Sequence, residues 1–81
     1  MRYFFNLAGA VYDLDNDGVE LASMSDARRM AAVSAGELIR DQPGLAWTGE
    51  EFRVEVTNSQ GLILFTVIVL GVDAPAGRKL D

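Results

Sequence analysis

Three aspartates, Asp13, Asp15 and Asp17, alternate along the sequence DLDNDG, and Gly18 follows them. This spacing is typical of the start of an EF-hand loop, in which side-chain oxygens bind calcium and a glycine allows the sharp bend. The same residues also have turn chemistry, because aspartate and asparagine side chains accept hydrogen bonds from nearby backbone amides and glycine tolerates positive φ. The remainder of the loop distinguishes the two interpretations.

The rest of this loop does not complete a calcium site. Its twelfth position, which is a bidentate glutamate in an EF-hand, is Met24. Its eighth position, which is usually apolar, is Glu20, and the residues before the loop favour a strand rather than a helix. The pattern therefore predicts an acidic hairpin turn and no metal site. The alternative is a weak cation site formed by Asp13, Asp15 and Asp17.

No side chain has an obvious catalytic partner. The chain contains no histidine and no cysteine, which removes the commonest general base, thiolate chemistry and the usual zinc ligands. Its serines therefore have no histidine to activate them. Acidic pairs such as Glu50 and Glu51 leave a two-carboxylate hydrolase as an alternative, although a domain of this size can hardly enclose a cleft. We predict a non-enzymatic protein with no catalytic residues and no cofactor.

Length and charge limit the partners of the protein. Its 81 residues make one domain, which removes roughly 60% of its unfolded surface from water. The net charge is −5, and the basic residues are scattered except for the pairs Arg28-Arg29 and Arg78-Lys79, so we expect no nucleic acid partner. The apolar run at residues 62–72 is about half the length that spans a bilayer. We therefore expect an acidic, soluble, cytoplasmic protein with no membrane partner.

Hydrophobic periodicity predicts the elements that position these residues. Residues 2–7 and 10–14 are expected to pair as two strands, and residues 51–57 and 62–70 as a hairpin. Between them, residues 23–41 form a helix that Ser23 and Asp26 cap, with Ser25 as the alternative cap. Ala31 and Leu38 are expected on its buried face. The prediction is an α+β fold of order β-β-α-β-β, in which one principal helix packs on one face of a small antiparallel sheet. Residues 1–72 form the domain and 73–81 a flexible tail.

The last strand is apolar on both of its predicted faces. One helix covers only one face of a sheet, so the other face of this strand needs a further apolar neighbour. A symmetric homodimer is the simplest source of that neighbour, and pairing through the strand edge is an equal alternative to contact through the face. We expect an interaction module that self-associates, with a small-ligand or weak cation-binding domain as the alternative function and an unidentified heterologous protein as a further partner. The predicted interface residues are Ile63, Phe65, Val67 and Val69, with Leu62, Leu64, Ile68 and Leu70 on the other face.

Four motifs follow one another in a recognisable order: RYFFNL near the start, a D-x-D-G-V-E-L segment that ends at Leu21, an alanine- and arginine-bearing helix, and FRVEVTNSQGLILFTV. Their order and spacing, from Arg2 to about Val69, resemble a small bacterial family of unknown function (DUF6894-like). The resemblance implies a compact α+β domain with an antiparallel sheet and one principal helix, and it implies no catalytic residue. This sequence departs from the family in TVIVLGV, which stays apolar where members often have a polar or prolyl break.

Overall fold

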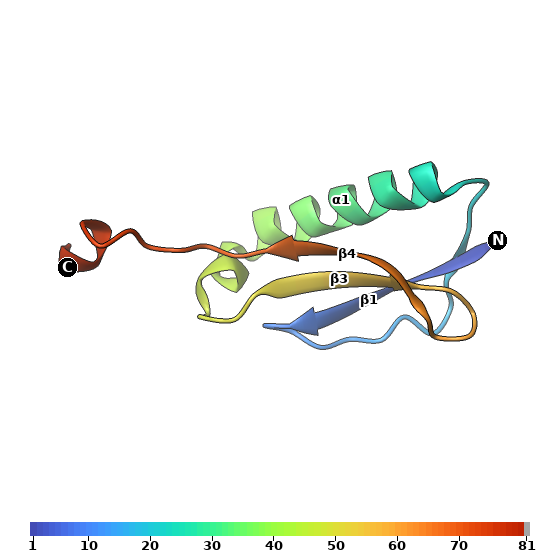
Figure 1. Ribbon diagram of the computed structural model, residues 1–81, viewed down its shortest axis with the longest axis horizontal. Coiled ribbons are helices and arrows are strands. Elements are labelled where there is room, and N and C mark those ends of the chain that lie inside the picture. Colours follow the sequence, from blue (N-terminus) through green and yellow to red (C-terminus); the bar gives the residue numbers. More distant parts are fainter. Residues whose placement is uncertain (81) are drawn as a thin grey trace.

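The computed structural model of the protein describes residues 1–80, which form a four-stranded antiparallel sheet and one α-helix. Figure 1 shows α1 lying along strands β1, β3 and β4. The strands lie in the order β2-β1-β3-β4, so β2 and β4 are the edges of the sheet. This arrangement confirms the predicted α+β class. The elements in chain order are β1 Arg2–Gly9, β2 Val19–Glu20, α1 Met24–Asp41, the 3-10 helix η1 Pro43–Trp47, β3 Phe52–Thr57, β4 Ile63–Val69 and the 3-10 helix η2 Gly77–Lys79.

Helix α1 begins and ends where its sequence predicts. The hydroxyl of Ser23 accepts a hydrogen bond from the backbone N–H of Asp26 (3.1 Å), which satisfies one of the free amides of the first turn. At the other end, the N–H of Gln42 donates to the carbonyl of Leu38 (2.8 Å). Pro43 then disfavours helical geometry at Gln42, and the chain enters η1. The predicted helix is thus confirmed at both termini.

The core lies between α1 and one face of the sheet. Ala27, Ala31 and Ala35 of the helix are buried, as are Phe52, Val54 and Val56 of β3. The small alanine side chains allow the helix axis to come close to the strands, while the β3 side chains and Tyr3 of β1 supply volume. The predicted alternation of β3 is therefore confirmed. Leu38, also predicted on the helix face, is half-buried against this core.

The predicted second strand is wrong in its position. Residues 10–14 do not form a strand, and a single bridge joins Leu7 to Asp13. The strand that pairs with the start of β1 is the two-residue β2, whose Val19 lies opposite Tyr3. Between these two contacts a side chain replaces the backbone as the partner of β1, because the N–H of Phe5 donates to a carboxylate oxygen of Asp15 (3.1 Å).

A β-bulge changes the face on which the first residue of β4 lies. Val56 pairs with Phe65, but the next residue of β3, Thr57, pairs with Ile63, so Leu64 is an extra residue. Phe65, with Val67 and Val69 beyond it, faces the helix and packs against the core. The predicted grouping of Ile63 with these three residues is wrong, because the bulge turns Ile63 to the opposite face, beside Thr57.

Beyond β4 the chain continues as an extended tail that leaves the rest of the protein (Figure 1). The N–H of Gly71 donates to the carbonyl of Ala46 in η1 (2.7 Å), so the chain is still held two residues after β4 ends. Residues 73–80 are exposed and contain η2. This segment corresponds to the predicted tail, 73–81, of which Asp81 lies outside the described residues.

Candidate functional site

The sheet face that α1 does not cover is here called the open face. It carries Phe4 and Asn6 of β1, Arg53 and Glu55 of β3, and Ile68 of β4, because side chains of paired residues in neighbouring antiparallel strands point to the same side. Sequence alternation predicts the polar row of β3 on this face. Since no helix packs here, the side chains of the open face are accessible to a ligand or partner.

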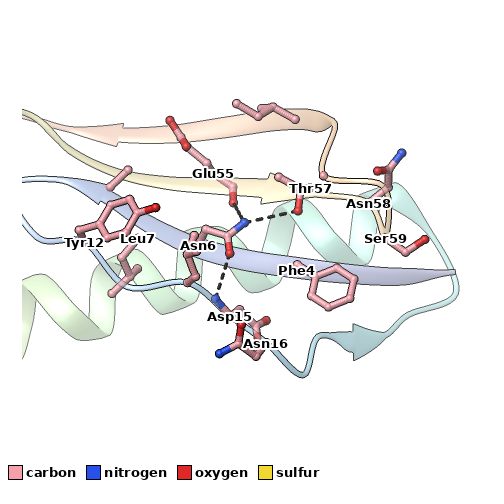
Figure 2. Close-up of a pocket in the computed structure, with 14 residues that line it drawn as sticks. Phe4, Asn6, Leu7, Tyr12, Asp15, Asn16, Glu55, Thr57, Asn58 and Ser59 are labelled. Atoms are coloured by element: carbon pink, nitrogen blue, oxygen red, sulfur yellow. Dashed lines mark hydrogen bonds between the residues drawn. The ribbon is translucent and has the colours of Figure 1, made fainter.

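A shallow pocket of about 410 Å³ lies on the open face (Figure 2). Strand β1 forms its floor, the segment with Tyr12 and Leu14 forms one wall, and the β3–β4 turn with Ile63 forms another. These three wall side chains are 73%, 53% and 57% exposed. Sequence reasoning missed this pocket. The alternation of Tyr12 and Leu14 with the neighbouring aspartates was the available signal, because it places both apolar side chains on one side of the chain.

Asn6 lies in the pocket with its polar atoms already engaged (Figure 2). Its Oδ1 accepts a hydrogen bond from the backbone N–H of Asp15 (3.0 Å). Its Nδ2 lies 3.4 Å from both the carbonyl oxygen of Glu55 and the hydroxyl of Thr57, which are long contacts for hydrogen bonds. Asn6 therefore joins the loop, β1 and β3, and its side-chain amide stabilises the fold.

The carboxylate of Asp15 is likewise engaged by backbone amides. One oxygen accepts from Phe5 (3.1 Å), and the other accepts from both Asp17 and Gly18 (3.0 Å each). Partial burial raises the pKa of Asp15, but the hydrogen bonds from Gly18, Phe5 and Asp17 together outweigh it, so the pKa lies below its ordinary value. Gly18 has φ of 72°, and a Cβ there would lie 2.9 Å from side-chain atoms of Arg2 and Phe4. The loop therefore requires both the aspartate and the glycine.

The predicted weak cation residues do not come together as a ligand set. Asp13, Asp15 and Asp17 all line a second hollow of about 400 Å³, between their loop and Ser34 of α1. Among residues 1–80, however, no group of three or more acidic side chains is arranged to hold a metal ion. Asp15 instead completes an Asx-type turn, which is the turn chemistry that the sequence predicts.

The acidic side chains of β3 lie beside an arginine on the open face. Arg53 donates to Glu55 (3.0 Å) and to Glu51 (3.1 Å), because residues two apart in a strand point the same way. The hydrogen bond to Glu55, followed by that to Glu51, raises the pKa of Arg53 further above its ordinary value. Glu55 and Asp15 are the acidic residues that line the open-face pocket, and each carboxylate is held by other groups of the chain.

The outer edge of β4 presents free backbone groups. Within β1, Phe5 and Leu7 direct their N–H groups toward the loop. The backbone groups of Phe4, Asn6 and Ala8 therefore point toward β3. Alternation along each antiparallel strand then directs the backbone groups of Val67 toward β3 and those of Thr66 and Ile68 toward the free edge. Both side chains are exposed. The edge is therefore open at the centre of β4.

An exposed apolar row continues this edge beyond β4. Ile68 is 57% exposed, Leu70 47% and Val72 69%. The three residues are two apart, so they continue the alternation of the strand. Gly71 holds the row in place through its bond to Ala46. A Cβ at residue 71 would lie 2.7 Å from ring atoms of Trp47, which shows how closely the indole covers the inner side of this segment.

The sequence of this domain matches a family model described as a domain of unknown function, DUF6894, over residues 2–71. The chain belongs to the DUF6894 family. The DUF6894 match includes all four strands, α1 and Gly71, and it ends before Val72 and the rest of the tail. Searches of the curated proteins and of the solved structures found no significant match. Within residues 1–80, no helix is both long enough and apolar enough to cross a membrane.

Proposed function

We propose that this DUF6894 domain is a non-enzymatic interaction module that associates with a second copy of itself through the free edge of β4. The observation that carries the proposal is the chemistry of that edge. Ile63–Val69 has the sequence ILFTVIV, without a charge or a proline. Edge strands are normally protected from pairing by lysine, by proline or by their short length. With seven residues, β4 has none of these protections, and its bulge lies at Leu64, near the start of the strand and away from Val67.

A second copy suits this edge because of the charge of the chain. The net charge of −5 makes most contacts between two copies repulsive at low ionic strength. The β4 edge is an uncharged surface, and pairing there brings no like charges opposite each other. The partner edge is also identical, so every feature that makes one edge available is present on the other. A two-fold contact uses the same patch on both copies.

An antiparallel pairing centred on Val67 uses the free groups of both copies. Thr66 of each copy then lies opposite Ile68 of the other copy. In both of these pairs the two residues exchange two backbone N–H···O hydrogen bonds. The product is one continuous sheet. Its two helices lie on one side and its two open faces on the other, since residues opposite each other in neighbouring strands share a face.

The pocket supports enzymatic function less well. Its two acidic side chains, Asp15 and Glu55, accept hydrogen bonds from backbone amides and from Arg53. A pair of carboxylates that works as acid and base needs one group free to bind the reacting proton. The pocket volume of about 410 Å³ does fall within the range of small-ligand sites. Ligand binding on the open face is therefore the second candidate function.

Light scattering of the purified protein at micromolar concentration tests the proposal. We expect a folded dimer, with twice the 8.8 kDa chain mass. Ile68→Lys places a charge in the contact, and Thr66→Pro removes an N–H that points away from β3, a position where edge strands tolerate proline. Both variants are expected to give folded monomers, whose urea midpoints lie below that of the dimeric wild type and do not change with protein concentration. Val33→Lys, at a 52% exposed position of α1, is the matched control and should remain dimeric.

Two results would contradict self-association through β4. The first is a well-folded wild-type monomer of about 9 kDa at these concentrations, which excludes obligate assembly. The second is a dimer that persists in both Ile68→Lys and Thr66→Pro, which places the contact elsewhere. A thermal-shift screen with small ligands and calcium then separates the remaining candidates, because a ligand that binds only the folded chain raises its melting temperature.

A further inference from the structure

The two ends of β4 carry separate exposed apolar groups that the proposed pairing would bring together. Ile63, at the start of the strand, is 57% exposed on the open face. Leu70 and Val72, after its end, are 47% and 69% exposed. Within one copy these groups cannot meet, because residues 63 and 72 are separated by roughly 30 Å of extended chain. Each end therefore lacks an apolar neighbour in the monomer.

We infer that the segment Leu70–Val72 of each copy covers Ile63 of the other copy and closes one side of its open-face pocket. The inference rests on the proposed pairing of β4 edges. In an antiparallel pairing centred on Val67, residue 70 of one strand lies opposite residue 64 of the other, next to Ile63. Alternation continued from Ile68 places Leu70 and Val72 on the open face, where the bulge also places Ile63.

The inner side of the segment is already occupied, which leaves its outer side for a partner. Gly71 donates to the carbonyl of Ala46 (2.7 Å), and the Trp47 indole lies against its Cα. The segment is therefore held along the sheet edge before any second copy arrives, and less conformational entropy is lost when it binds. Charge favours the same contact, because LGV at residues 70–72 and the partner surface at GLIL, residues 61–64, are both uncharged.

The pocket is incomplete without the second copy. Its wall at the β3–β4 turn is formed by Asn58, Ser59, Gly61 and Ile63. In the proposed dimer Leu70 and Val72 of the second copy extend this wall. Two pockets are completed in each dimer, because a two-fold contact repeats every interaction. Any apolar ligand of the open face would then bind the dimer in preference to the monomer.

Single cysteines test the inference cleanly, because the chain contains none. Full-length Ile63→Cys and Val72→Cys chains are mixed, allowed to exchange and treated with a short bismaleimide. We expect a covalent dimer from the mixture and none from either chain alone, since identical positions lie roughly 25 to 35 Å apart in an antiparallel pair. Val33→Cys mixed with Ile63→Cys is the matched control and should not crosslink. Light scattering before the reagent is added reports the mass of each sample.

The outcomes separate this inference from the proposed function. Wild-type protein that is monomeric overturns both. A dimer in which Ile63→Cys links to itself overturns the antiparallel arrangement, and a dimer with no link in the mixture overturns the covering of Ile63. A second variant, Val72→Asp, should weaken dimerisation by at least about tenfold, the ratio that corresponds to 1.4 kcal/mol. Equal dimerisation of Val72→Asp, Val33→Asp and the wild type would overturn the inference while leaving the β4 pairing intact.

Discussion

The carboxylate of Asp15 takes the place of a neighbouring strand for Phe5, whose backbone N–H donates to it at 3.1 Å. The same carboxylate accepts the amides of Asp17 and Gly18, so one side chain both closes a turn and extends the hydrogen bonding of β1. In the other direction, the backbone N–H of Asp15 donates to Oδ1 of Asn6 (3.0 Å). Two side chains thus join the loop at residues 10–18 to the sheet.

Asp15→Asn is expected to destabilise the fold by about 1 to 3 kcal/mol, the range for a lost partner of a half-buried polar group. An amide has only one acceptor oxygen, so it cannot serve Phe5 and the turn amides together. Urea unfolding measures the effect. Asp17→Asn removes the same charge from a neighbouring exposed carboxylate and is the matched control, which should change stability by less than about 0.5 kcal/mol. Equal stability of the two variants would contradict a structural role for the Asp15 side chain.

The stabilisation by Asp15 is expected to depend on pH in a defined direction. Its pKa in the folded state lies below the value of about 4 found in unfolded chains. Ionised Asp15 therefore stabilises the fold above the unfolded pKa, and this contribution is lost as the pH falls through the folded pKa. The stability difference between wild type and Asp15→Asn should be constant from pH 7 to about 5 and shrink below about pH 4. A stability difference between wild type and Asp15→Asn that grows as the pH falls would contradict a lowered pKa of Asp15 in the folded state.

Calcium is expected to bind no more tightly than the millimolar range, the weak end for loops of this kind. The reason is that Asp15 already accepts three amides and Met24 stands where the bidentate glutamate would be. Isothermal titration calorimetry measures the affinity. A micromolar site that Asp15→Asn abolishes would revive the cation-binding interpretation of Asp13, Asp15 and Asp17.

Ala31→Leu is expected to destabilise the fold by about 1 to 3 kcal/mol, as insertion of methylenes into a packed core does. Ala31 is fully buried where α1 meets the sheet, and a larger side chain must push the two layers apart. Ala32→Leu makes the same change one residue later on the exposed side of the helix and should be nearly neutral. Thermal or urea unfolding compares the two variants, and similar midpoints would show that the assigned helix face is wrong.

The elements with strong local patterns were the predictable ones. The buried face of α1 follows from Ala27, Ala31 and Ala35 at helical spacing, and its start from the Ser23 cap. The β3 strand follows from strict alternation of apolar and polar residues. In each case the local sequence and the tertiary packing favour the same structure, so the pattern alone is sufficient.

The failures occur where one residue changes the partner of the backbone. At residues 10–14 only the Leu7–Asp13 bridge forms. On one side of the bridge the N–H of Ala10 donates to the carbonyl of Glu51, and on the other the Asp15 side chain accepts the N–H of Phe5. The predicted face of Ile63 was wrong because one extra residue, Leu64, enters β4 and shifts the register. In an apolar run no local signal in the sequence marks such a bulge. The open-face pocket joins β1, a loop and the β3–β4 turn, so it depends on pairings that a linear pattern does not contain.

The two edges of the sheet are unequal, and this difference limits how far assembly can proceed. Opposite the seven-residue β4, the outer strand β2 has only two residues, and its Glu20 is charged and exposed. A particle joined through β4 would present only β2 at both of its outer ends. Such ends offer too few backbone groups for a further chain to add. Growth would therefore stop at a closed particle of two chains, and the exposed apolar strand that makes pairing possible would not lead to fibres.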